Sequence, residues 1–131
     1  MPMIQIGERQ LSYETSPRSG PPVLFIQGVG VPGCGWTPQT DALRSSFWVT
    51  SFDHRGIRNS DLGKDPLTID LFAQDALAVL DHLDIESVHV VGRSMGGVVA
   101  SQLALNAPER IRSLSLLCTF HKGKNAAKIN P

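Results

Sequence analysis

Short apolar runs alternate with longer amphipathic stretches along this chain. The run at residues 23–27 is apolar almost throughout, which is typical of a strand buried on both faces. Further strands are predicted at residues 47–52, 87–91 and 111–117, and an opening hairpin at residues 5–15. Strands of this length and composition predict a central sheet.

Residues 69–83 carry a broad apolar stripe at helical spacing and predict the longest helix. Thr68 can cap the start of this helix with its side-chain oxygen. Asp84 follows its end, where a residue that tolerates the left-handed conformation is needed. A second helix is predicted at residues 95–106, and a short one at about 40–44.

This alternation of strands and helices indicates βαβ units, and hence an α/β fold with a mostly parallel sheet and helices on both faces. In such sheets ligands bind outside the carboxyl ends of the strands. Residues 27–30, 53–55, 94 and 118–121 all follow predicted strands directly. We therefore expect these four segments to share one edge of the sheet.

Composition narrows the function classes. The chain has 131 residues, 41% of them hydrophobic, and its 12 basic and 12 acidic residues leave no net charge. A polyanion partner such as nucleic acid is therefore not expected, and no apolar run is long enough to suggest a membrane span. Cys34 and Cys118 lack metal-site spacing and are expected to be free thiols in a cytoplasmic protein without metal or cofactor.

The pattern that carries chemistry is Gly-Arg-Ser-Met-Gly-Gly at residues 92–97. It lies between a predicted strand and a predicted helix, which is the context that a G-x-S-x-G nucleophile turn requires. A sharp turn there would raise the Ser94 hydroxyl above the sheet. The helix start offers the Met95 N–H for a developing oxyanion, and the loop after residues 23–27 offers a second donor, best provided by Val29.

At this point the sequence resembles the N-terminal half of the α/β-hydrolase superfamily, in the branch of 3-oxoadipate enol-lactonase-like, haloperoxidase-like and esterase-like members. The segments that carry the resemblance are residues 23–30, Asp53-His54-Arg55-Gly56 with Ser60, residues 72–83, residues 88–100, and Ala107-Pro108-Glu109-Arg110 leading into 111–117. The resemblance implies a serine-type hydrolase that acts on a small ester or lactone. Ser94 would be the catalytic nucleophile, and Gly28 and Arg93 candidate substrate-binding residues.

Three positions depart from the family pattern. Gln27 stands where the family often has histidine, which changes a side chain that supports the oxyanion loop. Arg58 replaces the second glycine of the family's D-x-R-G-x-G-x-S loop. Arg93 precedes the nucleophile, where it could bind an anionic group, although a solvent-facing or ion-paired side chain is the favoured interpretation.

The resemblance also implies an acid and a histidine after a seventh and an eighth strand, whereas this sequence stops soon after the sixth. We therefore expect residues 1–131 to form a partial domain, truncated after about six strands, without lid or C-terminal strands, and with 121–131 as a loose tail. Glu109 falls at the wrong edge of the sheet, so His121 is the only candidate base. Activity is expected to be weak or absent.

Two alternatives remain. The chain could be an inactive hydrolase remnant or interaction fragment, whose exposed edge strand at residues 111–117 promotes self-association. Alternatively, Gly28, Gly30 and Gly33 fit G-x-G-x-x-G, with Asp53 twenty residues beyond, as in dinucleotide-binding domains. The residues after Gly33 disfavour the long helix that such a site needs.

Overall fold

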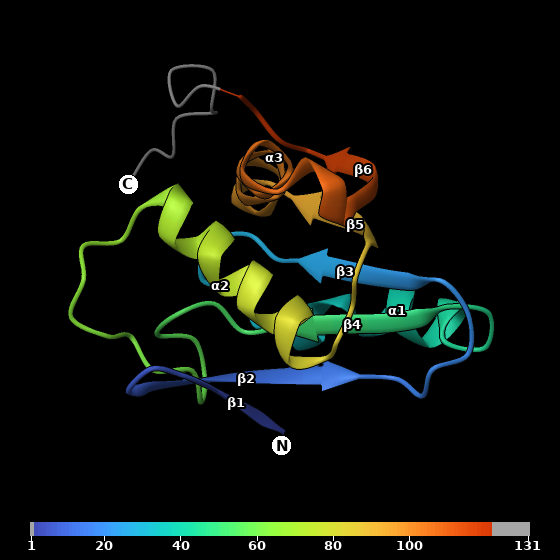
Figure 1. The fold of residues 1–131 in the computed structure, drawn as a ribbon, viewed down its shortest axis with the longest axis horizontal. Helices are drawn as coiled ribbons and strands as arrows, with labels where there is room; N and C mark the ends of the chain where they lie inside the picture. Colours follow the sequence, from blue (N-terminus) through green and yellow to red (C-terminus); the bar gives the residue numbers. More distant parts are fainter. Residues whose placement is uncertain (1, 122–131) are drawn as a thin grey trace.

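The computed structural model describes residues 2–121 and contains one six-stranded sheet (Figure 1). Its strands are β1 (Met3–Ile6), β2 (Arg9–Thr15), β3 (Pro22–Ile26), β4 (Trp48–Phe52), β5 (Val88–Arg93) and β6 (Ile111–Leu117). They lie in the order β1-β2-β4-β3-β5-β6. The four strands from β4 to β6 run parallel, and the β1–β2 hairpin is antiparallel and pairs antiparallel with β4.

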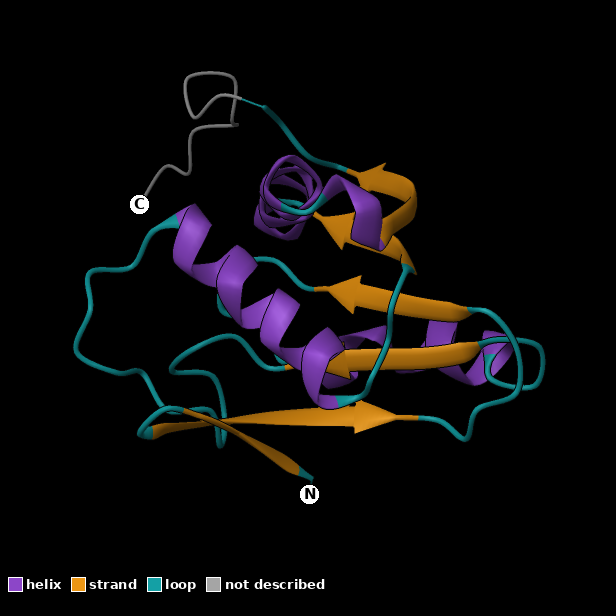
Figure 2. Ribbon diagram, in the orientation of Figure 1, coloured by secondary structure: helices purple, strands orange, loops and turns teal. Residues whose placement is uncertain are grey.

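Helices cover both faces of the sheet, as predicted (Figure 2). The helices are α1 (Thr37–Leu43), α2 (Ile69–His82) and α3 (Met95–Asn106), with short 3-10 helices η1 (Gly33–Trp36) and η2 (Pro108–Arg110). Alternate residues of β3 point to opposite faces, as the strand period of two requires. Leu24 and Ile26 pack with α2 and α3, whereas Phe25 packs with Trp36 of η1 on the other face.

The ends of α2 follow from its sequence. The Thr68 side chain accepts a hydrogen bond from the Leu71 N–H at 3.1 Å, which confirms the predicted cap. At the other end Asp84 has φ 54°, and the Ile85 N–H donates to the Leu80 carbonyl at 2.9 Å. The predicted left-handed residue after the helix is therefore confirmed.

The bounds of several elements differ from the sequence predictions. The first helix begins at Thr37 rather than near residue 40, because η1 leads directly into it. β5 continues to Arg93 rather than ending at 91, since Gly92 and Arg93 still pair with β6. The segment after β4 begins with buried residues, because His54 and Arg55 point into the protein.

β6 is an edge strand of the described sheet, and most of its residues are exposed. Leu114, Leu116 and Leu117 are 37–45% exposed, whereas Val88 and Val90 of the neighbouring β5 are fully buried. The predicted tail lies outside the described residues from position 122 onward. Within residues 2–121, none of the helices has the length and apolar character to cross a bilayer.

Candidate active site

Ser94 lies between β5 and α3, at the position that precedes the first helical residue. Its backbone has φ 55° and ψ −125°, a region that residues with a side chain rarely occupy. Such a conformation costs on the order of 1–3 kcal/mol and persists only where the surrounding structure holds it. Ser94 follows the carboxyl end of β5, at the edge where parallel β3, β4 and β6 also end.

Glycine at positions 92 and 96 allows the strand, the turn and the helix to approach one another. A Cβ on Gly92 would lie 2.4 Å from the Gly96 carbonyl oxygen. A Cβ on Gly96 would lie 2.2 Å from the Ile26 carbonyl oxygen. Glycine at these two positions therefore avoids clashes between a side chain and the neighbouring backbone.

The loop after β3 passes directly beside Ser94. A Cβ on Gly28 would lie 3.2 Å from the Ser94 Cβ and 3.7 Å from its Oγ. The buried Gln27 side chain turns back on the loop, and its Oε1 accepts the Gly28 N–H at 3.1 Å. The Gly28 N–H is thus already bonded within the protein and is unavailable to a ligand in this arrangement.

Two backbone N–H groups, one in the Ser94 turn and one in the loop that passes beside it, have no hydrogen-bond acceptor among residues 2–121. Met95 is the first residue of α3, so its N–H has no acceptor within the helix. The Val29 N–H, next along the loop from Gly28, makes no hydrogen bond to any residue in the described part of the chain, and Val29 is 71% exposed. These are the two N–H groups that the sequence predicts as oxyanion donors.

His54 is hydrogen-bonded to the loop after β3. Its Nε2 lies 2.8 Å from the Gln27 carbonyl oxygen, and its ring packs edge-on against Phe52 and Phe72. A carbonyl can only accept, so Nε2 carries the proton and donates. Burial lowers the pKa of His54 below 6.5, although the hydrogen bond to Gln27 and the charges of Asp75 and Asp53 act in the opposite direction. His54 is therefore a neutral donor that fixes the peptide preceding Gly28.

Asp53 anchors the start of η1. Its carboxylate accepts the Gly33 N–H at 2.7 Å, the Ser12 hydroxyl, and the Arg58 Nε–H at 3.0 Å. Asp53 is 2% exposed. A buried carboxylate with three internal donors is not placed to bind a ribose. Only the four-residue η1, which begins at Gly33, and the seven-residue α1 follow, instead of one long helix. The structure therefore disfavours the dinucleotide-binding alternative.

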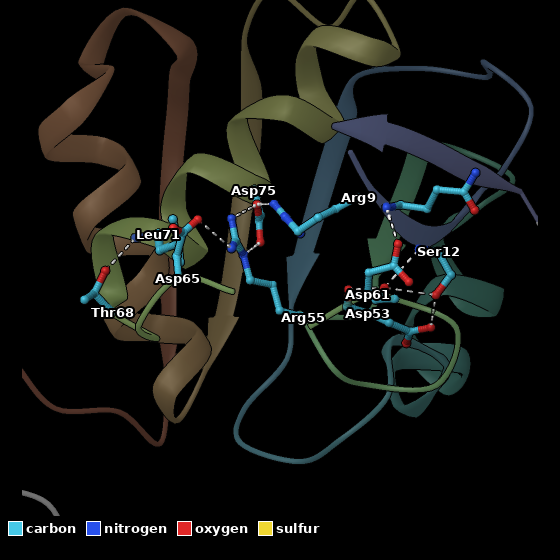
Figure 3. A network of polar contacts seen from close by, with 11 residues as sticks. Arg9, Ser12, Asp53, Arg55, Asp61, Asp65, Thr68, Leu71 and Asp75 are labelled. Atoms are coloured by element: carbon cyan, nitrogen blue, oxygen red, sulfur yellow. Dashed lines mark hydrogen bonds and ion pairs between the residues drawn. The ribbon is translucent and has the colours of Figure 1, made fainter. Parts of the chain in front are cut away.

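A buried ion-pair network ties α2 to the loop after β4 and to the hairpin (Figure 3). Asp75 of α2 accepts two hydrogen bonds from Arg55, at 2.6 and 3.0 Å, and one from Arg9, at 2.7 Å. The Asp75 side chain is 1% exposed and that of Arg55 4%. Because the network joins β2, the loop after β4 and α2, it holds the segment that contains His54 against the rest of the fold.

The comparisons with known proteins identify the family and the fold. A family model described as alpha/beta hydrolase fold matches residues 21–130. The chain belongs to the alpha/beta hydrolase fold family. The protein named "Putative carbamate hydrolase RutD" of Azorhizobium caulinodans is 38% identical over 89% of this chain and 44% of its own length.

Two further similarities concern a lactonase and an esterase. 3-Oxoadipate enol-lactonase 1 of Acinetobacter baylyi is 34% identical over 96% of this chain and 46% of its own length. The solved structure of a thermophilic esterase from Thermogutta terrifontis has a TM-score of 0.87 and 28% identity, over 93% of this chain and 47% of that one. The chain thus spans about half the length of these relatives.

The structure shows what the side chains do at the three positions that depart from the alpha/beta hydrolase pattern. Arg58 takes the place of a glycine and still adopts φ 47°, while its side chain forms an ion pair with Asp53. The turn is therefore kept without glycine. Gln27 replaces histidine and bonds the backbone of its own loop. The Arg93 side chain is exposed and forms no ion pair with the described residues.

Glu109 and His121, the acid and the histidine that follow Ser94 in the sequence, make no hydrogen bond to Ser94 in the described part of the chain. Glu109 lies in η2, before β6 begins, and hence at the opposite edge of the parallel sheet from Ser94. His121 is exposed. Among residues 2–121, the Ser94 hydroxyl has no hydrogen-bond partner. The structure therefore brings Ser94, Gly28 and Met95 together and leaves Glu109 apart.

The sequence pattern did not predict that Asp75 and His54 are buried and hold the segments around Ser94 in place. Asp75 interrupts the apolar stripe of the predicted helix at 69–83, and an acidic residue on an inward face was a readable signal of a buried partner. His54 carried no such signal, since its contacts with Gln27, after β3, and with Phe72 of α2 join positions far apart in the sequence.

Proposed function

We propose that this chain carries the nucleophile half of a serine-type hydrolase that acts on an ester or a lactone. The observation that carries the proposal is the strained Ser94 backbone beside two free N–H donors. The relatives named above include a lactonase, an esterase and a protein named as a carbamate hydrolase. All three names describe a carbonyl carbon bonded to a heteroatom, which a serine hydroxyl can attack.

In the proposed reaction, Ser94 Oγ attacks the carbonyl carbon and loses its proton to a base. The carbonyl oxygen becomes an oxyanion and accepts the Met95 and Val29 N–H groups. Collapse of the tetrahedral intermediate breaks the bond to the alcohol oxygen, which takes up the proton. Water then hydrolyses the acyl-Ser94 ester by the same steps in reverse and regenerates the hydroxyl.

The proposed reaction needs a base that accepts the Ser94 proton. A serine hydroxyl is a poor nucleophile until a group within about 3 Å accepts its proton. No residue in the described range is hydrogen-bonded to the Ser94 hydroxyl. We therefore propose slow acylation by the isolated chain, with rate enhancement from binding and the oxyanion donors alone. We propose that the substrate contacts the backbone of Gly28 and the side chain of Arg93.

Labelling with a fluorophosphonate probe tests this proposal. We expect a single adduct on Ser94 that forms slowly and is absent in Ser94→Ala. Ser101→Ala is the matched control, because Ser101 lies on α3 and its hydroxyl only bonds the Gly97 carbonyl. Labelling of wild type that persists in Ser94→Ala, or no labelling at all, would support the second candidate function, an inactive remnant or interaction fragment.

The second candidate function rests on β6. An edge strand with three partly exposed leucines offers unpaired backbone groups and apolar area to another chain. We propose that the isolated chain self-associates through this edge and is a cytoplasmic protein, in keeping with its free Cys34 and Cys118 thiols. Light scattering should detect oligomers that Leu116→Lys reduces. A monodisperse wild-type monomer contradicts self-association.

A further inference from the structure

The segment that follows β6 binds both polar groups of the Ser94 backbone. The Ser94 N–H donates to the Leu117 carbonyl at 2.9 Å. The Thr119 hydroxyl donates to the Ser94 carbonyl. The two partners stand on either side of a single residue, Cys118, so the chain contacts Ser94 twice within three positions.

Cys118 makes this double contact possible. It has φ 50°, in the left-handed region that residues with a side chain seldom adopt. A strand that continued past Leu117 would carry position 119 onward along the sheet edge. The left-handed residue instead turns the chain so that the Thr119 side chain reaches back to the start of α3.

Thr119 also contacts the first turn of α3. A Cβ added to Gly97 would lie 2.4 Å from the Thr119 Oγ1 and 2.7 Å from its Cγ2. The Ser94 carbonyl accepts a second hydrogen bond, from the Gly97 N–H at 2.9 Å. Both lone pairs of that carbonyl are therefore occupied, one by α3 and the other by Thr119.

The Ser94 conformation is sparsely populated and must be held by its surroundings. Rotation of the Ser94 peptide groups would break the bonds to Leu117, Thr119 and Gly97 together. The same rotation would move the Ser94 Oγ and the Met95 N–H relative to each other, because the Ser94–Met95 peptide carries that N–H. The orientation of hydroxyl and donor is thus coupled to the Thr119 hydrogen bond.

We propose that Thr119 is a positioning residue for Ser94, holding its carbonyl so that the hydroxyl and the Met95 N–H face one carbonyl substrate. This role rests on the proposed function of Ser94 as the nucleophile. Thr119 acts through the Ser94 backbone and does not touch the substrate. A plain packing role would depend on side-chain shape, whereas the positioning role depends on the hydroxyl.

Thr119→Val and Thr119→Ser separate these two roles. Valine keeps the shape and removes the hydroxyl, while serine keeps the hydroxyl and removes a methyl group. Ser101→Ala is the matched control, since it removes a hydroxyl from α3 that bonds only the Gly97 carbonyl and does not bond Ser94. Two readouts are measured on the full chain: the rate of Ser94 labelling by a fluorophosphonate, and amide hydrogen exchange of Gly97.

We expect Thr119→Val to slow labelling and to speed exchange of the Gly97 amide, each by roughly three- to tenfold, the effect of one hydrogen bond. Thr119→Ser and Ser101→Ala should stay within about twofold of wild type in both readouts. Equal losses in the valine and serine variants, or no change in the valine variant, overturn the proposal.

The two readouts also separate this proposal from the proposed function. If wild type is not labelled at Ser94, the hydrolase proposal fails, and Gly97 exchange alone decides the hydrogen bond. Faster Gly97 exchange in Thr119→Val, restored in Thr119→Ser, would then still support Thr119 as the residue that holds the turn. Unchanged exchange would refute it.

Discussion

Replacing Asp75 by asparagine removes one charge from the buried network while keeping the size of the side chain. In wild type the carboxylate receives hydrogen bonds from Arg55 at 2.6 and 3.0 Å and from Arg9 at 2.7 Å. The three side chains are 1%, 4% and 14% exposed for Asp75, Arg55 and Arg9. Water therefore cannot take over the role of the carboxylate, and two guanidinium groups lose their principal counter-charge.

Breaking a buried ion pair by removing one partner costs about 3–5 kcal/mol, because an uncompensated charge stays buried. A domain of this size is stable by about 5–15 kcal/mol in total. We therefore expect Asp75→Asn to lower the free energy of unfolding by about 3–5 kcal/mol, a large share of the total. The loss should appear as a lower midpoint with little change in the denaturant slope.

Urea unfolding followed by tryptophan fluorescence measures this, since Trp36 and Trp48 are both buried. Asp65→Asn is the matched control: its carboxylate is 73% exposed and lies 3.9 Å from the Arg55 Nη1. We expect the control to lose less than about 1 kcal/mol. A loss for Asp75→Asn as small as that for Asp65→Asn would refute the argument that this network holds α2 against the loop after β4.

Three further predictions follow from the site. Gly96→Ala should destabilise the chain by about 1–3 kcal/mol in urea unfolding, because the added Cβ would lie 2.2 Å from the Ile26 carbonyl oxygen. An unchanged unfolding midpoint would contradict this close packing. Ser94→Gly should stabilise the chain by up to about 1–3 kcal/mol, since glycine adopts φ 55° without strain. A lower unfolding midpoint in this variant would contradict strain at Ser94. Burial lowers the folded pKa of His54 below 6.5, so the unfolded chain takes up the proton first, and stability should fall as pH drops through 6.5 toward the folded pKa. Unfolding measured between about pH 5 and 8 should show a flatter profile in His54→Phe, and an identical profile would refute the assignment.

The sequence predicted those parts of the fold that depend on local pattern. Residues 92–97 combine a strand end, two close glycine contacts and a helix start within six positions, so the turn was readable without the structure. The Thr68 cap and the Asp84 terminator were readable for the same reason. Each of these features is decided by neighbours within a few residues along the chain.

The support behind the site could not be predicted in this way. His54 bonds Gln27 across 27 positions, and Thr119 bonds Ser94 across 25. Such pairs depend on how β3, β4, β5 and β6 are ordered in the sheet, and that order is not a property of any one segment. Arg58 shows the opposite case. Its φ of 47° is a local conformation that favours glycine, but arginine stands there and forms an ion pair with Asp53.

The most direct test of the account is a crystal structure of the chain after phosphonylation of Ser94. The phosphonyl oxygen stands in for the oxyanion of the proposed reaction. We predict that it lies about 2.7–3.1 Å from both the Met95 and the Val29 nitrogen atoms. An adduct whose oxygen points to solvent, with neither N–H within hydrogen-bond distance, would contradict the central claim that this turn and this loop together form an oxyanion site.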